Sequence, residues 1–313
     1  MQSLTTGKKG RVWAIAWRER YMYLILLPSV IATGLFCYWP MYGIIMAFKD
    51  YDMSTGILGS PWADNFGFGW FKLIFIDPDF LPVIRNTIII SIFKIIIGTS
   101  SAIILALLLN EVKHEKYKRT LQSVMYLPHF MSWVIIASLV YNFFTLSGGT
   151  FNNIVTQVFH HDKIQILSNT AYFRPLVYLT GVWKEAGFGT IIYLAAIAGV
   201  NPELYESAII DGAGRLKRAW HITLPSIKGT VVILLILNLS SIMSAGFDQI
   251  FNLYSPMVLD VGDIIDTYIY RHGILGMEFS YTTAIDLFKQ AISIALLVIF
   301  NFLAKRAGEE GVF

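Results

Sequence analysis

The sequence predicts an all-α, polytopic membrane protein with six transmembrane helices. Of its 313 residues, 55% are hydrophobic and 14% are charged, whereas soluble domains carry about 25% charged residues. The mean hydropathy is +0.58, which is more apolar surface than a soluble chain of this length can bury. Six apolar stretches are also long enough to cross a bilayer, which takes about 20 residues.

The first apolar stretch, 23–48, follows a basic N-terminal segment. It is too long for the apolar region of a cleaved signal peptide, and no small-residue cleavage site follows it, so we expect a retained first span. The N-terminal segment, 1–22, mixes aromatic and basic residues, which is typical of a segment at the lipid headgroups. We therefore predict that 1–22 is a cytoplasmic or interfacial segment.

The remaining apolar stretches complete a transmembrane domain over 23–304, followed by a tail at 305–313. The second span is expected at 87–109, the third at 124–146, the fifth at 227–247 and the sixth at 287–304. The fourth, 176–200, is the least regular, because two charges and two glycines fall within Trp183 to Thr190. Irregular backbone at membrane depth is tolerated only where it faces protein or water. We therefore expect the stretch 183–190 to face the interior of the bundle, a partner or a water-filled cavity.

The distribution of basic residues predicts the orientation of the spans. The first 20 residues carry five Lys and Arg, 111–120 carry four, 200–228 carry four and the tail carries two, together fifteen of the 24. The alternate loops, 49–85 and 248–286, are acidic and poor in basic residues. Because basic loops stay on the cytoplasmic side, both termini and the 200–226 loop are predicted to be cytoplasmic.

The single cysteine, Cys37, lies in the first apolar stretch. One cysteine excludes a disulfide framework and any zinc site built from cysteines. We expect it to be a small core residue.

The loop at 200–226 is long, polar and helix-prone. Asn201 is a favourable helix N-cap, and Pro202 suits the first helical position, where its missing N–H costs nothing. Gly212 and Gly214 interrupt the helical pattern, and a second short helix ends at Pro225. The pattern is consistent with an ordinary solvated loop and equally with a helix–turn–helix that docks another protein.

This loop resembles the EAA loop that marks permease subunits of binding-protein-dependent ABC importers. That pattern is Glu-Ala-Ala, two residues, Asp-Gly-Ala and, further on, an aromatic residue, Ile, any residue and Leu-Pro. The matching residues here are Glu206, Ser207, Ala208, Asp211, Gly212, Ala213, Trp220, Ile222, Leu224 and Pro225. Two of them depart from the pattern, since Ser207 replaces the first Ala and Trp220 replaces the more usual Phe.

The resemblance covers about residues 20 to 306. Stretches such as WKEAGFGTIIYLAAIAGVNPELYESA and GFDQIFNLYSPMVLDVGDIIDTYIYR are similar to the polysaccharide branch of sugar-importer permeases. Within that branch the chain resembles the larger permease subunit of alginate importers.

The resemblance implies a type I ABC importer permease fold in the bacterial cytoplasmic (inner) membrane. It implies an oligosaccharide or polysaccharide substrate, a second homologous permease, two ATP-binding subunits and an extracytoplasmic solute-binding protein as partners, with no nucleic acid. ATP and Mg would be bound by the ATPase partners, and no cofactor is expected in this chain. The residues implied in coupling to the ATPases are Glu206, Ser207, Ala208, Asp211, Gly212, Ala213, Leu224 and Pro225.

Several catalytic motifs are absent from the sequence. It contains no G-x-x-x-x-G-K-[ST], so it cannot cradle ATP phosphates through that loop. It contains no HExxH or GxSxG either. His160 and His161 lack neighbours at metal-ligand spacing and are expected to be solvated loop residues.

Ionisable and sugar-binding side chains within the spans are the candidates for a substrate pathway. Lys94 can snorkel, pair with an acid on another helix or face an anionic substrate. Aromatic faces and hydrogen-bonding side chains suit a sugar, although the same residue types also anchor and join helices. The candidates are Tyr141, Asn142, Trp183, Lys184, Glu185, Tyr193, Asn238, Ser241, Asp248 and Gln249.

The acidic residues Asp260, Asp263 and Asp266 are expected to form a solvated face. They could instead meet a solute-binding protein, and calcium ligation is a remote third option, because their spacing is not that of a known calcium loop.

The alternative function is an ion-coupled secondary transporter. That class predicts inverted repeats and many intramembrane acids, and neither is evident. A membrane scaffold or receptor would not need the glycine-hinged loop.

Overall fold

The computed structural model describes residues 17–306, 308 and 311. Over that range the regular elements are helices, and extended pairing is limited to one isolated antiparallel bridge between Lys49 and Trp62. The chain divides into two compact units, Met1–Trp70 and Phe71–Phe313. Most of the predicted interfacial segment 1–22, and residues 307, 309–310 and 312–313 of the predicted tail, lie outside the described residues.

The first unit contains one long apolar helix. Helix α2, Arg20–Thr33, continues through a π-helical turn, Gly34–Tyr38, into a 3₁₀ segment, Trp39–Phe48. The whole stretch is 29 residues long, enough to cross a membrane, and nothing in its most apolar window is buried within the chain. Cys37 is exposed on it, so the expectation of a core cysteine is wrong.

The segment after this helix folds onto Lys49. The Lys49 ammonium donates to the carbonyls of Leu58 at 2.7 Å and Ser60 at 2.9 Å, while the Trp70 indole N–H donates to the Lys49 carbonyl at 3.1 Å. Two single-turn helices, α3 (Gly56–Gly59) and α4 (Asp64–Gly67), fill the loop. Helix α5, Gly69–Ile76, leads from this unit into the second.

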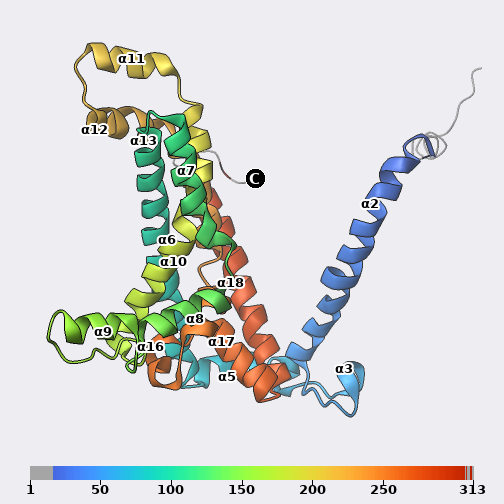
Figure 1. Cartoon of the computed structure of the whole chain (residues 1–313). Helices are drawn as coiled ribbons and strands as arrows, with labels where there is room; N and C mark the ends of the chain where they lie inside the picture. The colour runs from blue at the N-terminus through green and yellow to red at the C-terminus, as the bar shows by residue number, and fades with distance from the viewer. Residues whose placement is uncertain (1–16, 307, 309–310, 312–313) are drawn as a thin grey trace, which may run out of the picture. The chain divides into compact units, whose positions relative to one another are not determined.

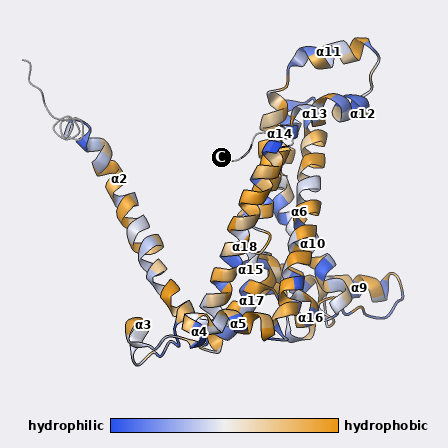
Figure 2. Cartoon of the chain, turned by 180° about the vertical axis from the view of Figure 1, so that it is seen from behind, coloured by the Kyte–Doolittle hydropathy of each residue, from blue (hydrophilic) through white to orange (hydrophobic). Residues whose placement is uncertain are grey.

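Two long single helices and three bent helix pairs form the second unit's main body (Figure 1). The single helices are α6 (Phe80–Asn110) and α18 (Phe279–Arg306), and the longest helix of the bent pairs is α10 (Thr170–Ala198). Helix α6 packs along α10, and α14 (Lys228–Ser240) packs against α18. Figure 2 shows that these helices are largely apolar along their length.

The bent pairs each join an apolar helix to a neighbour through a short break. Helix α7 (Glu115–Tyr126), extended by a 3₁₀ turn to Phe130, meets α8 (Trp133–Phe144) at 96°. Helix α10 meets α11 (Pro202–Ile210) at 76°, and the segment Arg215–Ser226 meets α14 at 63°. Counting each pair once, the described part of the chain holds up to six spans, which agrees with the six predicted.

The segment Arg215–Ser226 combines three kinds of helix. Helix α12 (Arg215–Arg218) leads into a π-helical turn, Ala219–Thr223, and then α13 (Leu224–Ser226). A π-helical turn inside an α-helix holds one extra residue. The second short helix predicted after Gly214 is therefore present, and it continues to the residue after Pro225.

The predicted interruption of the fourth span is wrong, because α10 is continuous from Thr170 to Ala198. Gly187 serves helix packing instead. A Cβ at this position would overlap the carbonyl oxygen of Met125 on α7. Small residues allow helix backbones to approach closely in membranes, so the glycine signals a helix contact rather than a break.

Two apolar cores hold the second unit together. The larger one surrounds α8, α10 and α15 (Phe247–Leu253), with Phe173, Val177 and Ile250 fully buried. The second lies between α6, α10 and the start of α14, around Ala106 and Ile227.

Short helices close the end of this unit that is opposite α11 (Figure 1). They are α9 (Thr150–Gln157), α16 (Leu259–Gly262), α17 (Ile265–Ile269) and a π-helical segment, Tyr270–Leu275. Asp77 joins two elements here, because its carboxylate accepts hydrogen bonds from the hydroxyls of Tyr268 and Tyr281, both at 2.7 Å.

The acidic residues 260, 263 and 266 do not form one solvated face. Asp260 is exposed, but Asp263 is buried and pairs with Arg271 at 2.6 Å. Asp266 pairs with Lys289 of α18 at 2.5 Å. The expectation was wrong for these two because the sequence does not reveal cations that arrive from distant elements. In the range 17–306, no cluster of three or more potential metal ligands is found.

Candidate functional site

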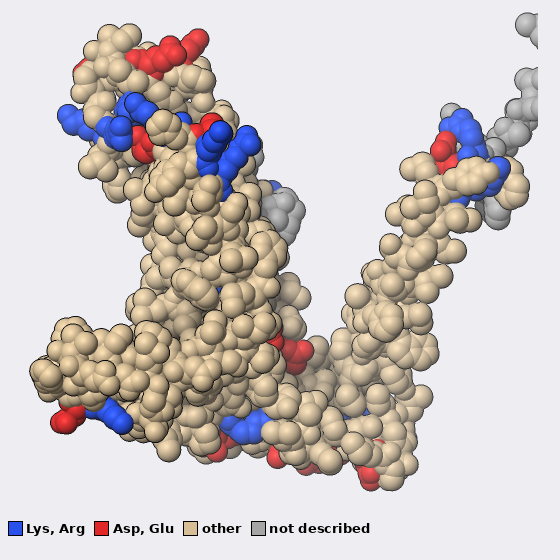
Figure 3. All heavy atoms as spheres, in the orientation of Figure 1, with Lys and Arg blue, Asp and Glu red and all other residues tan. Residues whose placement is uncertain are grey.

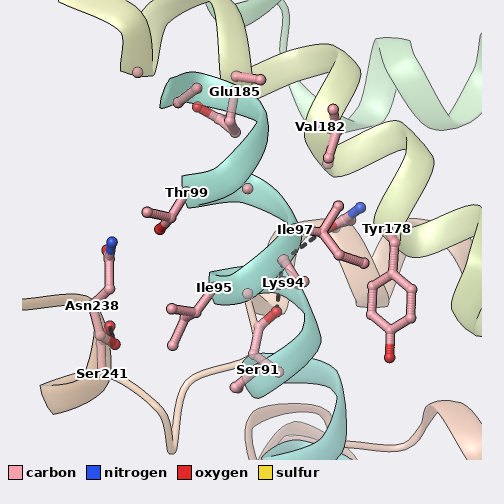
Figure 4. Close-up of a pocket in the computed structure, with 18 of the residues that line it drawn as sticks. Ser91, Lys94, Ile95, Ile97, Thr99, Tyr178, Val182, Glu185, Asn238 and Ser241 are labelled. Atoms are coloured by element: carbon pink, nitrogen blue, oxygen red, sulfur yellow. Dashed lines mark hydrogen bonds between the residues drawn. The ribbon is translucent and has the colours of Figure 1, made fainter. Parts of the chain in front are cut away.

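The main cavity of the second unit lies between α6, α10 and the segment that joins α14 to α15 (Figure 4). Its volume is about 570 Å³. Its lining is mostly apolar and aromatic, with a few polar groups. The polar and aromatic lining residues are Ser91, Lys94, Thr99, Trp133, Tyr178, Glu185, Phe188, Tyr193, Asn238, Ser241, Ser244, Phe247, Asp248 and Gln249.

Helix α6 contributes one face to the cavity. Ser91, Lys94, Gly98 and Ala102 line it at intervals of three and four residues, which is the spacing of one helix face. Of these four residues, the sequence drew attention only to Lys94, which is not among the ten pathway candidates. The signal was available, since polar residues at this spacing stand out among the isoleucines of the second span.

The segment 241–246 is not helical. The prediction of one continuous fifth span over 227–247 is therefore wrong for its last part. Helix α14 ends at Ser240, and α15 begins at Phe247 after Gly246 with φ of +94°. The Ser241 hydroxyl donates back to the carbonyl of Asn238 at 2.9 Å. Non-helical backbone at membrane depth is tolerated where it lines a cavity, and this segment lines the cavity.

Lys94 is held by neutral acceptors. Its ammonium donates to the carbonyl of Ala245 at 2.8 Å and to the Gln249 side-chain carbonyl at 2.6 Å. Figure 4 shows the Lys94 side chain beside Ser91. The ammonium thereby ties α6 to the non-helical segment and α15.

Gln249 is fixed from its other side. Its amide N–H groups donate to the carbonyl of Val177 at 2.7 Å and to the Thr180 hydroxyl at 3.0 Å, both on α10. Because both donors are engaged there, the amide oxygen faces Lys94. The side chain, 1% exposed, thus sets the direction of the acceptor that Lys94 meets.

The structure brings six of the ten pathway candidates to the cavity. They are Glu185, Tyr193, Asn238, Ser241, Asp248 and Gln249. The other four, Tyr141, Asn142, Trp183 and Lys184, do not line it. A position inside a span does not reveal which face of the helix meets the cavity, so the sequence could not separate these four from the other six.

The four candidates that do not line the cavity lie at the surface of the chain or contact other helices and turns. The Tyr141 hydroxyl donates to the carbonyl of Leu253 at 3.2 Å, and Asn142 and Trp183 are exposed on the chain's surface. Lys184 is buried and donates to the carbonyl of His129 at 2.5 Å.

Glu185 is the boundary between the cavity and a second polar cluster. Its carboxylate lies 2.7 Å from His129 Nδ1 and 3.4 Å from Lys184 Nζ. The His129 ring stacks on Phe188, with 3.9 Å between ring centroids. These contacts join the turn after α7 to the middle of α10 at the level of the cavity.

The second candidate site is the loop at 200–226, which forms a projecting arm at the far end of this unit (Figure 1). Asn201 caps α11, because its side chain accepts the N–H of Glu203 at 3.0 Å. The Tyr205 and Thr223 hydroxyls lie 2.9 Å apart. Arg215 pairs with Glu111, at the end of α6, at 3.4 Å. The Arg215–Glu111 pair joins the arm to the end of α6, and the Tyr205–Thr223 contact joins the first helix of the arm to its last segment.

Helix α11 ends in a Schellman motif at Gly212, whose φ is +74°. The N–H of Ala213 donates to the carbonyl of Ala208 at 2.8 Å, and the N–H of Gly212 donates to that of Ile209 at 3.0 Å. Only glycine adopts this left-handed conformation without strain. A Cβ at Gly212 would meet no atom within 4 Å, so space does not explain the glycine.

The coupling candidates lie on the arm's surface. Glu206, Ser207, Asp211, Gly212 and Pro225 are exposed, whereas Ala208, Ala213 and Leu224 are half-buried. Large apolar side chains are exposed as well, with Ile210 at 86% and Leu216 at 87%.

Comparison with known proteins gives one family. The family described as "Binding-protein-dependent transport system inner membrane component" matches residues 98–307. Two similar proteins come from Bacillus subtilis (strain 168). Protein LplB is 42% identical over 99% of this chain and 96% of its own length. The polygalacturonan/rhamnogalacturonan transport system permease protein YteP is 44% identical over 98% and 94%.

Two solved structures agree with the fold over nearly the whole chain. A chain of a bacterial alginate ABC transporter, in complex with a periplasmic protein that holds an alginate pentasaccharide, superposes with a TM-score of 0.86. It is 37% identical and covers 96% of this chain and 100% of its own. A chain of a bacterial ABC transporter involved in import of the acidic polysaccharide alginate gives a TM-score of 0.85 at 38% identity, covering 95% and 99%.

Proposed function

Because the chain belongs to the family of inner-membrane components of binding-protein-dependent transport systems, we propose that it moves an oligosaccharide or polysaccharide into the cell by alternating access. It is a multi-pass permease subunit of an ABC importer, and ATP is bound by the ATPase partners rather than by this chain. This membership replaces the alternative of an ion-coupled secondary transporter.

The cavity chemistry supports a carbohydrate as substrate. Aromatic side chains such as Tyr178 and Tyr193 offer flat apolar faces, and Asn238, Ser241 and Asp248 offer hydrogen-bonding groups beside them. Ligand sites typically combine an apolar lining with a few placed polar groups. YteP and the two alginate transporters, by their descriptions, also handle polysaccharides.

The arm at 200–226 is proposed to be the docking element for the ATPase subunits. The observation that carries this is its exposed apolar surface at Ile209, Ile210 and Leu216. The arm is braced internally by the Tyr205–Thr223 contact and is joined to the end of α6 by the Arg215–Glu111 pair. Exposed apolar patches mark interaction sites. Because the arm is joined to α6 by this ion pair and continues directly into α14, it would transmit a displacement to both helices, which border the cavity.

The proposed orientation places this arm and both termini in the cytoplasm. On the face shown in Figure 3, basic side chains gather over the arm and the neighbouring start of α7, and the middle of the unit is nearly free of charge. The basic residues at this end include Lys113, Lys116, Arg215 and Lys217. The positive-inside rule assigns such an end to the cytoplasm.

The proposed assembly contains this chain, a second homologous permease, two ATP-binding subunits and an extracytoplasmic solute-binding protein. Large parts of the apolar surface would then be covered by the partner permease and by lipid. Support comes from the family description, which names a binding-protein-dependent system, and from the alginate transporter complex with its periplasmic protein.

Site-specific cross-linking tests the docking proposal. In the assembled transporter carrying Cys37→Ser, a cysteine at Ile210 should cross-link to an ATP-binding subunit. A cysteine at Val158, also exposed at 65% but at the opposite end of the unit, is the matched control. Equal capture from both positions, or none from Ile210, would show that the arm is not the docking element.

Uptake into proteoliposomes tests the transport proposal. The complete transporter with its binding protein should accumulate a labelled oligogalacturonate only when ATP is supplied to the side that holds the ATPases. Gly212→Arg should leave membrane insertion intact and abolish this uptake, because a bulky left-handed residue disrupts the end of α11. Uptake driven by an ion gradient without ATP would contradict the proposal.

A further inference from the structure

We propose that the substrate is an acidic saccharide and that Lys94 binds its carboxylate in the cavity. This inference rests on the proposed function of carbohydrate import and names the substrate class. Three observations support the inference: the charge of Lys94, the hydroxyl of Ser91 beside it, which is unpaired among the described residues, and the backbone that surrounds the ammonium.

Lys94 has no carboxylate in direct contact within the described residues, and Glu185 acts on its charge only from a longer distance. An ammonium has three N–H donors, and two of them go to the neutral oxygens of Ala245 and Gln249. No ion pair joins Lys94 to a described residue, whereas the buried Lys184 and Lys289 each have a carboxylate within 3.4 Å. Lys94 is half-buried, and a cation withdrawn from water is costly unless it meets an opposite charge, so the third donor calls for an anion in the cavity.

Ser91 provides a second group for the same anion. It precedes Lys94 by three residues on the same face of α6 and also lines the cavity. Its hydroxyl is buried and has no hydrogen-bond partner among the described residues. Buried hydroxyls are usually satisfied, and a carboxylate has two oxygens, one for each of these donors.

The backbone of the non-helical segment passes close to the ammonium. A Cβ on Gly246 would lie 2.8 Å from Lys94 Nζ, and the φ of +94° at this position favours glycine. Gln249, locked by its bonds to α10, holds the ammonium in place. The site is therefore fixed by three elements before any ligand binds.

Neither acidic residue of the cavity, Glu185 or Asp248, forms an ion pair with Lys94 in the way proposed for the substrate's carboxylate. Glu185 is engaged by His129 and Lys184, and Asp248 is exposed with no ion pair to the described part of the chain. A carboxylate accepts hydrogen bonds from sugar hydroxyls. Acids near the cation would also moderate the affinity for an acidic sugar, and a transport pathway has to release what it binds.

The test compares a charged probe with its neutral form. Trigalacturonic acid and its fully methyl-esterified form are titrated against the purified four-subunit transporter without its binding protein. We expect the wild type to bind the acid more tightly than the ester. Lys94→Met should weaken binding of the acid about tenfold or more, the effect of one desolvated charged hydrogen bond, and leave the ester unchanged. Ser91→Ala should weaken binding of the acid by a smaller factor.

Lys184→Met is the matched control, because Lys184 is a lysine within the same unit, more buried than Lys94, that does not line the cavity. It should keep the wild-type ratio of acid to ester affinity, whatever its effect on stability. Lys94→Arg, which retains the charge, should keep a preference for the acid.

Three outcomes would overturn the inference. They are equal affinity of the wild type for acid and ester, an equal loss for both ligands in Lys94→Met, and failure of both Lys94→Met and Lys94→Gln to assemble. The last would mean that Lys94 is neutralised by a partner subunit. ATP-dependent uptake by the wild type, measured separately, decides the proposed function, so the two failures can be told apart.

Discussion

Three glycines, Gly187, Gly212 and Gly246, meet three different physical demands. Gly187 allows α10 to approach the backbone of α7, Gly212 adopts a left-handed conformation at the end of α11, and Gly246 does so where the chain passes Lys94. In the sequence all three are only glycines. The capping role of Gly212 could be predicted from its place after a helical pattern, whereas the close approach at Gly187 could not.

The Gly212 conformation gives a prediction with an internal control. Gly212→Val should cost about 1–2 kcal/mol in the arm at 200–226, because a β-branched residue is strained at positive φ. It should reduce ATP-dependent uptake strongly. Gly214→Val should have little effect, because Gly214 has φ of −68° and open space around it. Equal uptake by the two variants would show that backbone conformation at 212 is unimportant.

Of the ten pathway candidates chosen by residue type, six line the cavity and four do not. Glu185 and Lys184 are adjacent in sequence, yet only Glu185 lines the cavity, because neighbouring residues on a helix point about 100° apart. The absolute rotation of α10 depends on what it packs against. That information lies in α6 and α7 and not in the candidate's own segment.

At the scale of elements, the sequence predicted the apolar stretches well and their internal geometry poorly. The fourth span was expected to be irregular but is a continuous helix, and the fifth was expected to be regular but ends at Ser240. Charges and glycines inside a span do not by themselves break it, since packing can require both. The non-helical segment 241–246 is held by a hydrogen bond from Lys94 of α6 to the carbonyl of Ala245, about 150 residues apart in sequence.

Two glycine-to-alanine variants separate packing from helix propensity. Alanine favours a helix interior by up to about 1 kcal/mol over glycine, so Gly98→Ala, where a Cβ would meet nothing within 4 Å, should stabilise the protein slightly. Gly187→Ala should destabilise it by about 1–3 kcal/mol, because the Cβ would overlap the Met125 carbonyl.

Thermal unfolding of the purified transporter in detergent measures both changes. The two variants should move the transition temperature in opposite directions from the wild type. An increase for both would mean that α7 moves away from α10 at little cost.

At the scale of the whole molecule, contacts between distant segments hold the end opposite the arm. Asp77 meets hydroxyls from α17 and α18, which lie about 200 residues later, and Lys289 of α18 meets Asp266 of α17. The sequence predicted the fold class and the number of spans. It gave no sign of these pairings, because neither partner is marked by periodicity or by a motif.

The Asp77 contacts predict a pH dependence of stability. Burial raises the pKa of Asp77, but hydrogen bonds from Tyr281 and Tyr268, the Asp79 N–H and the His272 charge outweigh it, and the net pKa is below the ordinary value of 3.8. A carboxyl whose pKa is lower in the folded state stabilises the fold above its unfolded pKa. This contribution is lost as the pH falls through the folded value.

Unfolding measured between pH 6 and pH 3 checks this dependence. The wild type should lose stability below about pH 4, and the double variant Tyr268→Phe, Tyr281→Phe should lose less over that interval, since its Asp77 pKa returns toward normal. An identical pH profile for the two proteins would show that the Asp77 hydrogen bonds do not contribute to acid sensitivity.

Lys94, in the middle of α6, also bears on how the chain enters the bilayer during synthesis. A lysine at the centre of an inserting helix opposes partitioning by roughly 2.5–3.5 kcal/mol, while each isoleucine favours it by about 0.3–0.6 kcal/mol. The seven isoleucines at 88–90, 92 and 95–97 surround Lys94 and offset most of that opposition. The translocon can therefore release this helix into lipid early, before the later segments that cradle its ammonium have been made.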